Sequence, residues 1–442
     1  MKRHYRPYPE YKDSGVAWLG QIPAHWDVRR LKFVARIYNG ATPKSTEMDY
    51  WGGEINWVTP DDLGSLEGRY ISKTKRTLTD KGYASCGATL VPAGSIVIST
   101  RAPIGHLAIA TKSVCTNQGC RSLVPVKDID NLFLYFVLYA GKAVLQSLGS
   151  GSTFQELSAR ELGNFPVSFP PLPEQRAIAA FLDRETAHID ALIAKKRELI
   201  DLLKQQRTAI ISHAVTKGLD PSVPLKDSGV EWLGQIPAHW DVRRLKFMCW
   251  LSAVYGANVP ASDYQQEGIR FLRTTDIDDY GNLLNENPVY ISSEAARDYL
   301  LDDGDLLFSR SGTIGRSFLY KRNKHHEECA YAGYLVRFSL RQSYSPEFVF
   351  YFTKSTAFAD WLGLSVIQST IGNVNGQKYA NMHLPVPPLS EQRAIAEYLD
   401  CETARIDGLI QKIEESIELL QRQRTALISA AVTGKIDVRN QG

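Results

Sequence analysis

The side chains best suited to recognition chemistry are polar, basic and planar residues that recur in the two halves of the chain. Ser99-Thr-Arg101 stands before an Ile-Gly pair in the first half, and Ser309-Arg-Ser-Gly-Thr313 stands before the same pair in the second. Arginine hydrogen-bonds the O6 and N7 atoms of guanine, asparagine and glutamine pair with adenine, and serine and threonine contact phosphates or base edges. These segments indicate contact with DNA at two separate places.

Polar loops at comparable positions extend both sets. The candidate DNA-contact residues of the first half are Thr59, Asp61, Ser99, Thr100, Arg101, Asn117, Gln118, Ser152 and Thr153. Those of the second half are Arg273, Thr274, Thr275, Ser309, Arg310, Ser311, Thr313, Ser369 and Thr370. A basic run could add phosphate contacts that do not depend on base sequence. Its members are Arg29, Arg30 and Lys32, repeated as Arg243, Arg244 and Lys246.

Catalytic motifs do not accompany these residues. The phosphate-binding loop GxxxxGK[ST] is missing, and Asn287-Pro-Val-Tyr290 lacks the second proline that a DNA amino-methyltransferase motif requires. Pro60-Asp61 followed by Glu67 would suit a nuclease, but Arg69 stands where lysine is needed. We therefore predict a protein that is not an enzyme and holds no cofactor.

Metal-ligand residue types are present but isolated. His325-His-Glu-Glu-Cys329 is a single short cluster with no second ligand pair, so a solvated loop is the better interpretation. Cys115 and Cys120 have no partner motif and are expected to be buried free thiols. No metal site is predicted.

Composition limits the class of protein. The 442 residues are 44% hydrophobic, which excludes wholesale disorder and a collagen-like fibre. With 51 Lys+Arg against 48 Asp+Glu, the net charge of +3 does not by itself indicate a nucleic-acid binder or a membrane anchor. The N-terminus lacks the apolar core of a secretory signal, and six scattered cysteines suggest a reducing compartment, so we expect a cytoplasmic protein. The apolar run 132–145 is too short for the ~20 residues of a membrane span.

The chain is an internal duplication. Residues 12–33 (KDSGVAWLGQIPAHWDVRRLKF) return as residues 226–247 with one change, Ala17 to Glu231, and residues 171–220 return as 388–437. The segments between them, which we call the first head (14–170) and the second head (228–386), resemble each other only faintly. Recombination between the duplicated ends would explain this pattern. The favoured explanation is that the ends do one job twice while the heads do two different jobs.

The duplicated ends predict long helices over 174–213 and its repeat. Apolar residues follow a heptad pattern through Leu182, Ile189, Leu192, Leu199, Leu203 and Ile210, and through Leu399, Ile406, Leu409, Ile413, Leu420 and Leu427. Each helix would be ~60 Å long. Such a helix needs a partner for its apolar stripe. Its own duplicate, in an antiparallel pair between the heads, is the favoured partner, and its own head is the alternative.

The heads read as mixed α and β. Strands are expected at 95–99, 122–126 and 334–338, and one packed helix per head at 131–148 and 347–364. Four tryptophans (Trp18, Trp26, Trp232 and Trp240) are expected to pack in cores. The fold class is therefore α+β, with two mixed α/β domains in a pseudo-two-fold tandem repeat. The predicted boundaries are 1–170, 171–217, 218–386 and 387–442.

The chain resembles the specificity subunits of type I restriction–modification systems. The resemblance covers the whole chain and rests on (Y)KDSG(V)xWLGxIPxHW at 11–26 and 226–240, and on Pro-Pro-Leu-x-Glu-Gln-Arg-Ala-Ile-Ala at 170–179 and 387–396. The family element Ser-Arg-x-Gly-x-Ile-Gly is intact at 309–315 and degenerate at 99–105, where Ala102-Pro103 interrupts it.

This resemblance implies a DNA-recognition subunit without catalysis. Each head would be a target-recognition domain that reads one half of a gapped DNA sequence, and the helices would set the gap. Two modification (methyltransferase) subunits would dock on the helices, and restriction subunits would join that core. We assign partner contact to Glu174, Gln175 and Arg176 and to their repeats Glu391, Gln392 and Arg393. The alternatives are a self-contained DNA-modifying enzyme and a coiled-coil scaffold that does not bind DNA.

Overall fold

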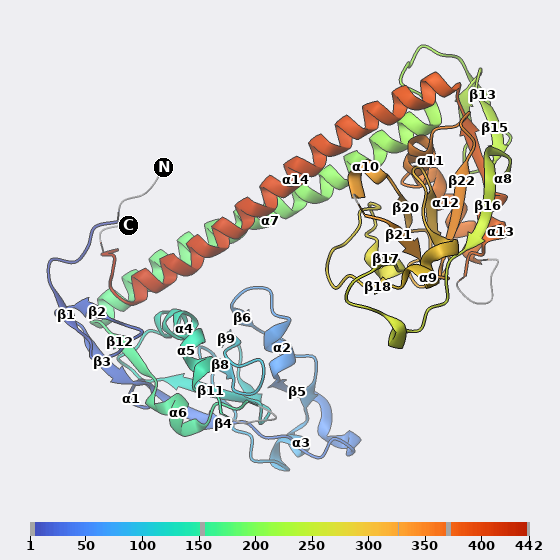
Figure 1. The fold of residues 1–442 in the computed structure, drawn as a ribbon. Coiled ribbons are helices and arrows are strands. Elements are labelled where there is room, and N and C mark those ends of the chain that lie inside the picture. The colour runs from blue at the N-terminus through green and yellow to red at the C-terminus, as the bar shows by residue number, and fades with distance from the viewer. Residues whose placement is uncertain (1–4, 151–154, 326, 368–372, 440–442) are drawn as a thin grey trace. The chain divides into compact units, whose positions relative to one another are not determined.

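The computed structural model describes residues 5–150, 155–325, 327–367 and 373–439. By its internal contacts the chain forms two units: unit 1 comprises Met1–Lys196 with Glu415–Gly442, and unit 2 comprises Arg197–Glu414. Both divisions fall inside a long helix, α7 (Leu172–Lys217) or α14 (Leu389–Val432). Each unit therefore holds one head and part of each long helix (Figure 1). The predicted domain boundaries follow sequence motifs and stay a prediction.

The first head is built mainly from short strands (Figure 1). Its strands are β1 (Tyr11–Asp13), β2 (Gln21–Pro23), β3 (Asp27–Arg30), β4 (Ala35–Asn39), β5 (Trp51–Val58), β6 (Tyr70–Ile71), β7 (Thr77–Leu78), β8 (Ile96–Ser99), β9 (Leu107–Ala110), β10 (Val114–Thr116), β11 (Cys120–Pro125) and β12 (Pro166–Phe169). Its helices are α1 (Leu31–Val34), a 3-10 turn at Met48–Tyr50, α2 (Pro60–Gly64), α3 (Asp80–Ala84), α4 (Asn131–Ala140), α5 (Lys142–Ser147) and α6 (Ala159–Asn164).

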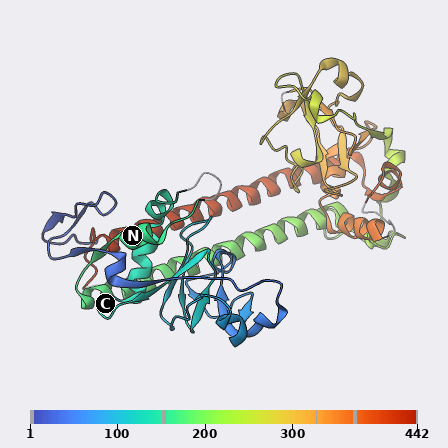
Figure 2. The ribbon, with the colours of Figure 1, turned by 90° about the horizontal axis from the view of Figure 1, so that it is seen from below.

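A five-stranded sheet forms the centre of this head, in the order β4-β11-β8-β9-β6. The ladders β4–β11, β11–β8 and β8–β9 are antiparallel, and β6 pairs with β9 in parallel. Strand β8 is buried along its whole length, which fits its β-branched sequence Ile-Val-Ile. A second view again shows the blue-to-teal strands of this head beside the N-terminal part of α7 (Figure 2).

The second head repeats the plan with variations. Its strands are β13 (Leu225–Asp227), β14 (Gln235–Pro237), β15 (Asp241–Arg244), β16 (Cys249–Tyr255), β17 (Ile269–Leu272), β18 (Tyr290–Ile291), β19 (Leu306–Ser309), β20 (Ser317–Leu319), β21 (Cys329–Tyr331), β22 (Leu335–Leu340) and β23 (His383–Val386). Its helices are α8 (Leu245–Met248), α9 (Ser293–Ala296), α10 (Arg322–His325), α11 (Pro346–Phe352), α12 (Thr356–Ile367) and α13 (Gly376–Ala380), with 3-10 turns at Ala261–Asp263, Thr274–Asp276 and Arg297–Tyr299. The sheet order β16-β22-β19-β20 corresponds to β4-β11-β8-β9.

The strands predicted at 95–99, 122–126 and 334–338 are confirmed as β8, β11 and β22, with shifted ends. The prediction of one helix per head was wrong, because each region is two helices. The first breaks at Gly141, where an added Cβ would lie 2.3 Å from Cζ of Phe165. The second breaks after Phe352, and the Ser355 hydroxyl accepts a hydrogen bond from the Phe358 amide at the start of α12.

Within each unit the parts of α7 and α14 pack antiparallel. In unit 1, Leu182 and Val432 share one core while Asp190 pairs with Arg424, at 2.8 Å between Oδ1 and Nε. In unit 2 the repeat of that pair joins Arg207 and Asp407, at 3.0 Å. Both arginine side chains are mostly buried, so the two pairs fix the register of the helices.

The predicted helix seam is partly wrong. Leu182 and Ile189 are buried as expected, but Leu192 and Leu199 are 36% and 45% exposed, and the adjacent Ile193 and Ile200 are buried in their place. In the second helix Leu399 and Ile406 are buried, whereas Leu409 is 39% exposed. In a straight helix, positions seven residues apart are displaced by about 20° around the axis. Positions chosen at strict seven-residue spacing therefore move gradually away from the buried face.

The packing role predicted for the tryptophans is confirmed. Trp26 and Trp240 are fully buried, and Trp18 and Trp232 pack against the two main cores. Trp26 also lies near the place where the chain ends meet in unit 1. There, an antiparallel bridge joins Arg6 to Asp437.

Candidate nucleic-acid interface

One end of the central sheet gathers most of the candidate residues in the first head. Strand β4 ends there at Asn39, β8 ends at Ser99, and β11 begins at Cys120, which pairs with Ser99. We call residues 39–42, 99–101 and 117–121 the first polar edge. Candidates from two chain segments, 99–101 and 117–118, thus meet at one end of the sheet.

Ser99 and Thr100 form hydrogen bonds inside the first polar edge that fix its loops. Both are fully buried. The Ser99 hydroxyl donates to the Pro103 carbonyl at 2.7 Å and accepts from the His106 amide at 2.8 Å, while the Thr100 hydroxyl donates to the Gly119 carbonyl at 3.3 Å. These two side chains shape the loops that carry the accessible groups, and direct DNA contact by them stays a prediction.

The exposed groups of the first polar edge are planar or charged. Arg101 is exposed and its Nε lies 3.1 Å from a carboxylate oxygen of Glu156. The Asn117 carboxamide accepts from the Gly119 amide at 3.0 Å, and exposed Gln118 accepts a hydrogen bond from Thr42. Asparagine, glutamine and arginine side chains can all read base edges.

Thr59 and Asp61 lie at the start of helix α2 beside this edge. The Asn117 amide donates to the Val58 carbonyl at 2.9 Å, which places the preceding strand next to the edge. Thr59 caps the helix in a reciprocal pair with Asp62, and Asp61 forms an exposed ion pair with Lys75 at 2.6 Å. The structure brings both residues near the polar edge in structural roles.

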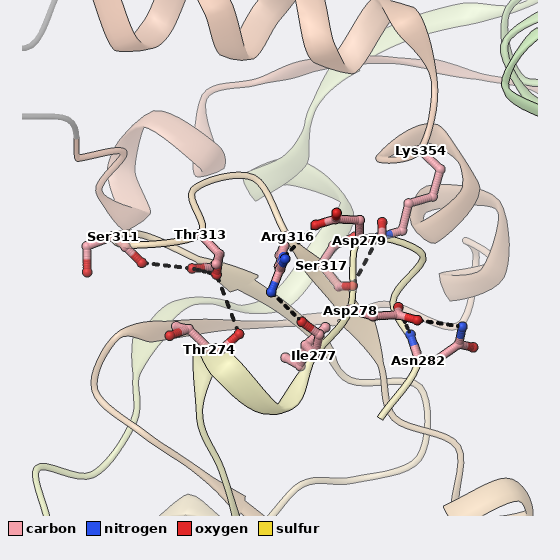
Figure 3. Close-up of polar contacts among 11 residues, drawn as sticks. Thr274, Ile277, Asp278, Asp279, Asn282, Ser311, Thr313, Arg316, Ser317 and Lys354 are labelled. Carbon is pink, nitrogen blue, oxygen red and sulfur yellow. Dashed lines mark hydrogen bonds and ion pairs between the residues drawn. The ribbon is translucent and has the colours of Figure 1, made fainter. Parts of the chain in front are cut away.

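The equivalent end of the second sheet carries Ser309 and the residues that follow it. We call residues 255–258, 309–313 and 333–336 the second polar edge. Ser309 is fully buried, and its hydroxyl donates to the Ser311 carbonyl at 3.1 Å. Thr313 donates to the Thr274 carbonyl at 3.4 Å, which joins this edge to the loop after β17 (Figure 3).

Arg273 is already engaged inside the second head. Its guanidinium donates to both carboxylate oxygens of Asp276, at 2.7 and 3.0 Å, and to the Asn287 carbonyl at 3.1 Å. The bond to Asp276 raises the pKa of Arg273. Its neighbour Thr275 is exposed. DNA contact by Arg273 would require release of these bonds, and it remains a prediction.

Sequence reasoning missed the residues that fasten the neighbouring loop 276–282. Arg316 donates to an Asp279 carboxylate oxygen at 2.6 Å and to the Ile277 carbonyl at 2.8 Å (Figure 3). Lys354 donates to the Asp279 and Ser317 carbonyls at 3.2 and 3.1 Å. Burial lowers the pKa of Lys354 to about 7. These contacts join segments that are far apart in the sequence, so they have no local sequence signal.

Four of the candidate DNA-contact residues lie outside the described residues: Ser152, Thr153, Ser369 and Thr370. Within the described part of the chain, no group of three or more His, Cys, Asp or Glu residues is placed to hold a metal ion. His325 instead stacks on Tyr320, and burial raises the pKa of the Cys115 thiol to about 12. In the same residues, no helix is long and apolar enough to cross a membrane.

The residues assigned to partner contact divide into buried and exposed members. Gln175 is fully buried, and its carboxamide bonds the Asp130 amide and the Pro170 carbonyl, both at 2.8 Å. Gln392 is equally buried and accepts from the Ser345 amide at 2.9 Å. Arg176 and Arg393 are exposed. The glutamines thus fasten each head to its helix, and partner contact stays a prediction.

Glu174 receives three hydrogen bonds at the start of α7. The donors are the Tyr8 hydroxyl at 2.5 Å, the His25 ring at 2.9 Å and the Trp26 indole at 3.0 Å. In unit 2, the Glu391 carboxylate accepts hydrogen bonds from the His239 ring at 2.8 Å and from the Trp240 indole at 3.1 Å. The two repeated sequence motifs are therefore in direct contact: residues 12–26 bind the Glu-Gln-Arg motif at 174–176, and residues 226–240 bind the one at 391–393.

An Asp-x-x-Thr motif, present once on each long helix, forms hydrogen bonds with the head of the same unit. In unit 1, Arg69 donates to Asp183 at 2.6 Å and to Thr186 at 2.9 Å. In unit 2, the Tyr351 hydroxyl donates to Asp400 at 2.5 Å and also contacts Thr403. The helix side of the contact is constant, and the two heads meet it with different residues.

Arg69→Met is expected to lower the free energy of unfolding of unit 1 by about 2 kcal/mol, because charged hydrogen bonds are lost at a largely buried site. Thermal unfolding followed by circular dichroism would measure this. Lys73→Met, at a nearby exposed position, is the matched control and should change little. Equal stability of the two variants would contradict the role given to Arg69.

The profile of the family described as "Type I restriction modification DNA specificity domain" matches residues 23–202 and 237–419. The chain therefore belongs to this family. It is 30% identical over 320 residues to the "Type I restriction enzyme MjaIX specificity subunit" of Methanocaldococcus jannaschii, covering 70% of each chain. It is 22% identical to the EcoKI specificity subunit of Escherichia coli, covering 94% of this chain and 90% of that one.

Solved structures support the same fold. A chain from a structure titled as the assembly and conformational transition of a type I R-M system matches with a TM-score of 0.70 at 18% identity, covering 93% of this chain and 98% of that one. The HsdS subunit of Thermoanaerobacter tengcongensis matches with a TM-score of 0.51, at 18% identity, covering 94% and 98%. The predicted resemblance, the α+β fold and the assignment as a non-catalytic DNA-recognition subunit are confirmed.

Proposed function

We propose that the two heads read the two halves of one bipartite, gapped DNA sequence. The observation that carries this proposal is the contrast between the polar edges. Both lie at the same end of equivalent sheets, yet their side chains differ: Gln118 and Arg101 in one, Arg310 and Thr313 in the other. Different donors and acceptors at equivalent places suit two different base sequences.

We propose further that α7 and α14 bind the modification subunits, with restriction subunits joining the assembly in the cytoplasm. The support is that some exposed side chains recur at matching positions of the two helices, such as Arg176 and Arg393, where folding does not demand it. A surface that is repeated on both helices suits two copies of one partner. The exposed basic run at Arg29 and Arg30 would add phosphate contacts.

Sequencing of methylated DNA from a host that expresses this chain with its modification subunit tests the proposal. The expected result is one methylated motif with two specified halves and an unspecified gap. Methylation without a gapped motif would contradict it. Binding of S-adenosylmethionine by the isolated chain in calorimetry would favour a self-contained enzyme, and failure of the assembled complex to retain duplex DNA would favour a scaffold.

A further inference from the structure

Arg310 is a half-buried cation in the second polar edge. Its guanidinium carbon lies 5.0 Å from the ring centre of Tyr255, the last residue of β16. Within the described residues its Nε is buried and has no hydrogen-bond partner. A guanidinium carries five N–H donors, and a buried donor without an acceptor costs free energy. The contact with Tyr255 orients the guanidinium but supplies no such acceptor.

Arg121 has a similar environment in the first polar edge. It lies on β11 directly opposite Asn39, the last residue of β4, and its Nη1 donates to the Asn39 carboxamide oxygen. Its Nε is also buried without a hydrogen-bond partner in the described residues. Burial lowers the pKa of Arg121. The Asn39 bond accounts for one donor of the five.

The two arginines reach equivalent places from different parts of the sheet, since Arg121 lies on β11 and Arg310 directly follows β19. The ladders pair Asn39 with Arg121 and Tyr255 with Val336, so Asn39 and Tyr255 hold matching positions in the two sheets. In the second head Val336 stands where Arg121 would be, and the arginine comes from the residue after β19 instead. In each head, therefore, one guanidinium lies at the end of an edge strand of the sheet: Arg121 at the end of β4 and Arg310 at the end of β16.

The surroundings favour a base over a phosphate as the acceptor for the guanidinium N–H groups other than the buried Nε. Phosphate contacts suit exposed, mobile cations, whereas these guanidinium groups are half-buried and held by a carboxamide or an aromatic ring. Side chains of types that can read bases flank them, including Gln118 in the first edge and Ser311 in the second. A planar, oriented guanidinium matches the paired O6 and N7 acceptors of guanine.

We propose that Arg121 and Arg310 each read a guanine, one in each half of the DNA site. This inference rests on the proposed function and goes beyond it by naming a base and the two residues that specify it. Arg121 was not among the residues predicted from the sequence.

Single variants of the full chain, expressed with the modification subunit, test the inference through the methylated motif. Arg121→Ala should relax one guanine position in one half-site and leave the other half unchanged, and Arg310→Ala should do the reverse. Discrimination at that position should fall by about ten- to a hundredfold. Arg121→Gln and Arg310→Gln should shift the preference at that position towards adenine. Arg160→Ala, at an exposed position of α6, is the control and should keep the full motif.

Several results would overturn the inference. One is an unchanged motif with uniformly weaker, more salt-dependent binding, which marks a phosphate contact. Another is relaxation in both halves at once. If an alanine variant fails to assemble, its glutamine variant decides, and a retained guanine preference there also overturns the inference. If the wild-type chain directs no gapped motif at all, the proposed function itself has failed, so the two failures are distinguishable.

Discussion

Exchange of residues 228–386 for the corresponding head of another specificity subunit is expected to change one half of the recognised sequence and to leave the other half intact. The second polar edge and its supporting loops lie within this segment, whereas the first polar edge lies in unit 1. The loss of preference for the original half-site should amount to several orders of magnitude, since each mismatched base pair costs about 1–3 kcal/mol and the costs add. Sequencing of methylated DNA would measure it.

The success of that exchange depends on the docking contacts. The residue that takes the place of Tyr351 must be able to form hydrogen bonds with Asp400 and Thr403. The hydrogen bond from the Ser345 amide to the Gln392 carboxamide must also be preserved. A chimera that restores these contacts should methylate its new motif, and one that lacks them should be less stable. A change in both half-sites would contradict separate reading by the two heads.

Glu174→Ala is expected to destabilise unit 1 by about 3 kcal/mol. The carboxylate is 6% exposed, and its loss strands the Tyr8 hydroxyl and the Trp26 indole among apolar side chains, at about 1–3 kcal/mol for each buried donor. Hydrogen exchange measured by mass spectrometry suits a chain of two units, because it reports on each unit separately. Amides of residues 8–26 should exchange roughly a hundredfold faster.

The duplication supplies the matched control for this experiment. Glu391→Ala removes the same carboxylate from unit 2, but that side chain is 29% exposed and, among the described residues, accepts hydrogen bonds from only His239 and Trp240. We expect a loss of about 1 kcal/mol there. Glu174→Gln, which keeps one acceptor oxygen, should lie between the two. Equal effects of the two alanine variants would contradict the importance of burial at Glu174.

The long helices were predictable because their cause is local. The run from Glu174 to Val215 contains no proline or glycine, and its apolar period repeats in the duplicate. The choice between neighbouring apolar residues was not predictable in the same way. Leu192 and Ile193 both suit a helix interface, and only packing against α14 decides which of them is buried.

The features that were missed depend on contacts between distant segments. The need for glycine at the break at Gly141 follows from the ring of Phe165, and the place of Arg121 follows from the register between β11 and β4. The candidate site was predicted where a family element marks it, as at Ser309–Thr313. The internal roles of Gln175 and Arg273 could not be predicted, because their hydrogen-bond partners lie in other loops.

The bridge between Arg6 and Asp437 makes the connectivity of the chain nearly circular. In unit 1 the end of the chain meets its beginning, and Arg439 lies over the ring of Tyr8, at 4.9 Å. In unit 2 the corresponding place is crossed by the continuous segment 218–224. A gene that opened the chain in that segment and joined residue 439 to residue 5 would encode the same two units with the heads in the opposite order. We therefore expect each head to form the same structure whichever head is translated first.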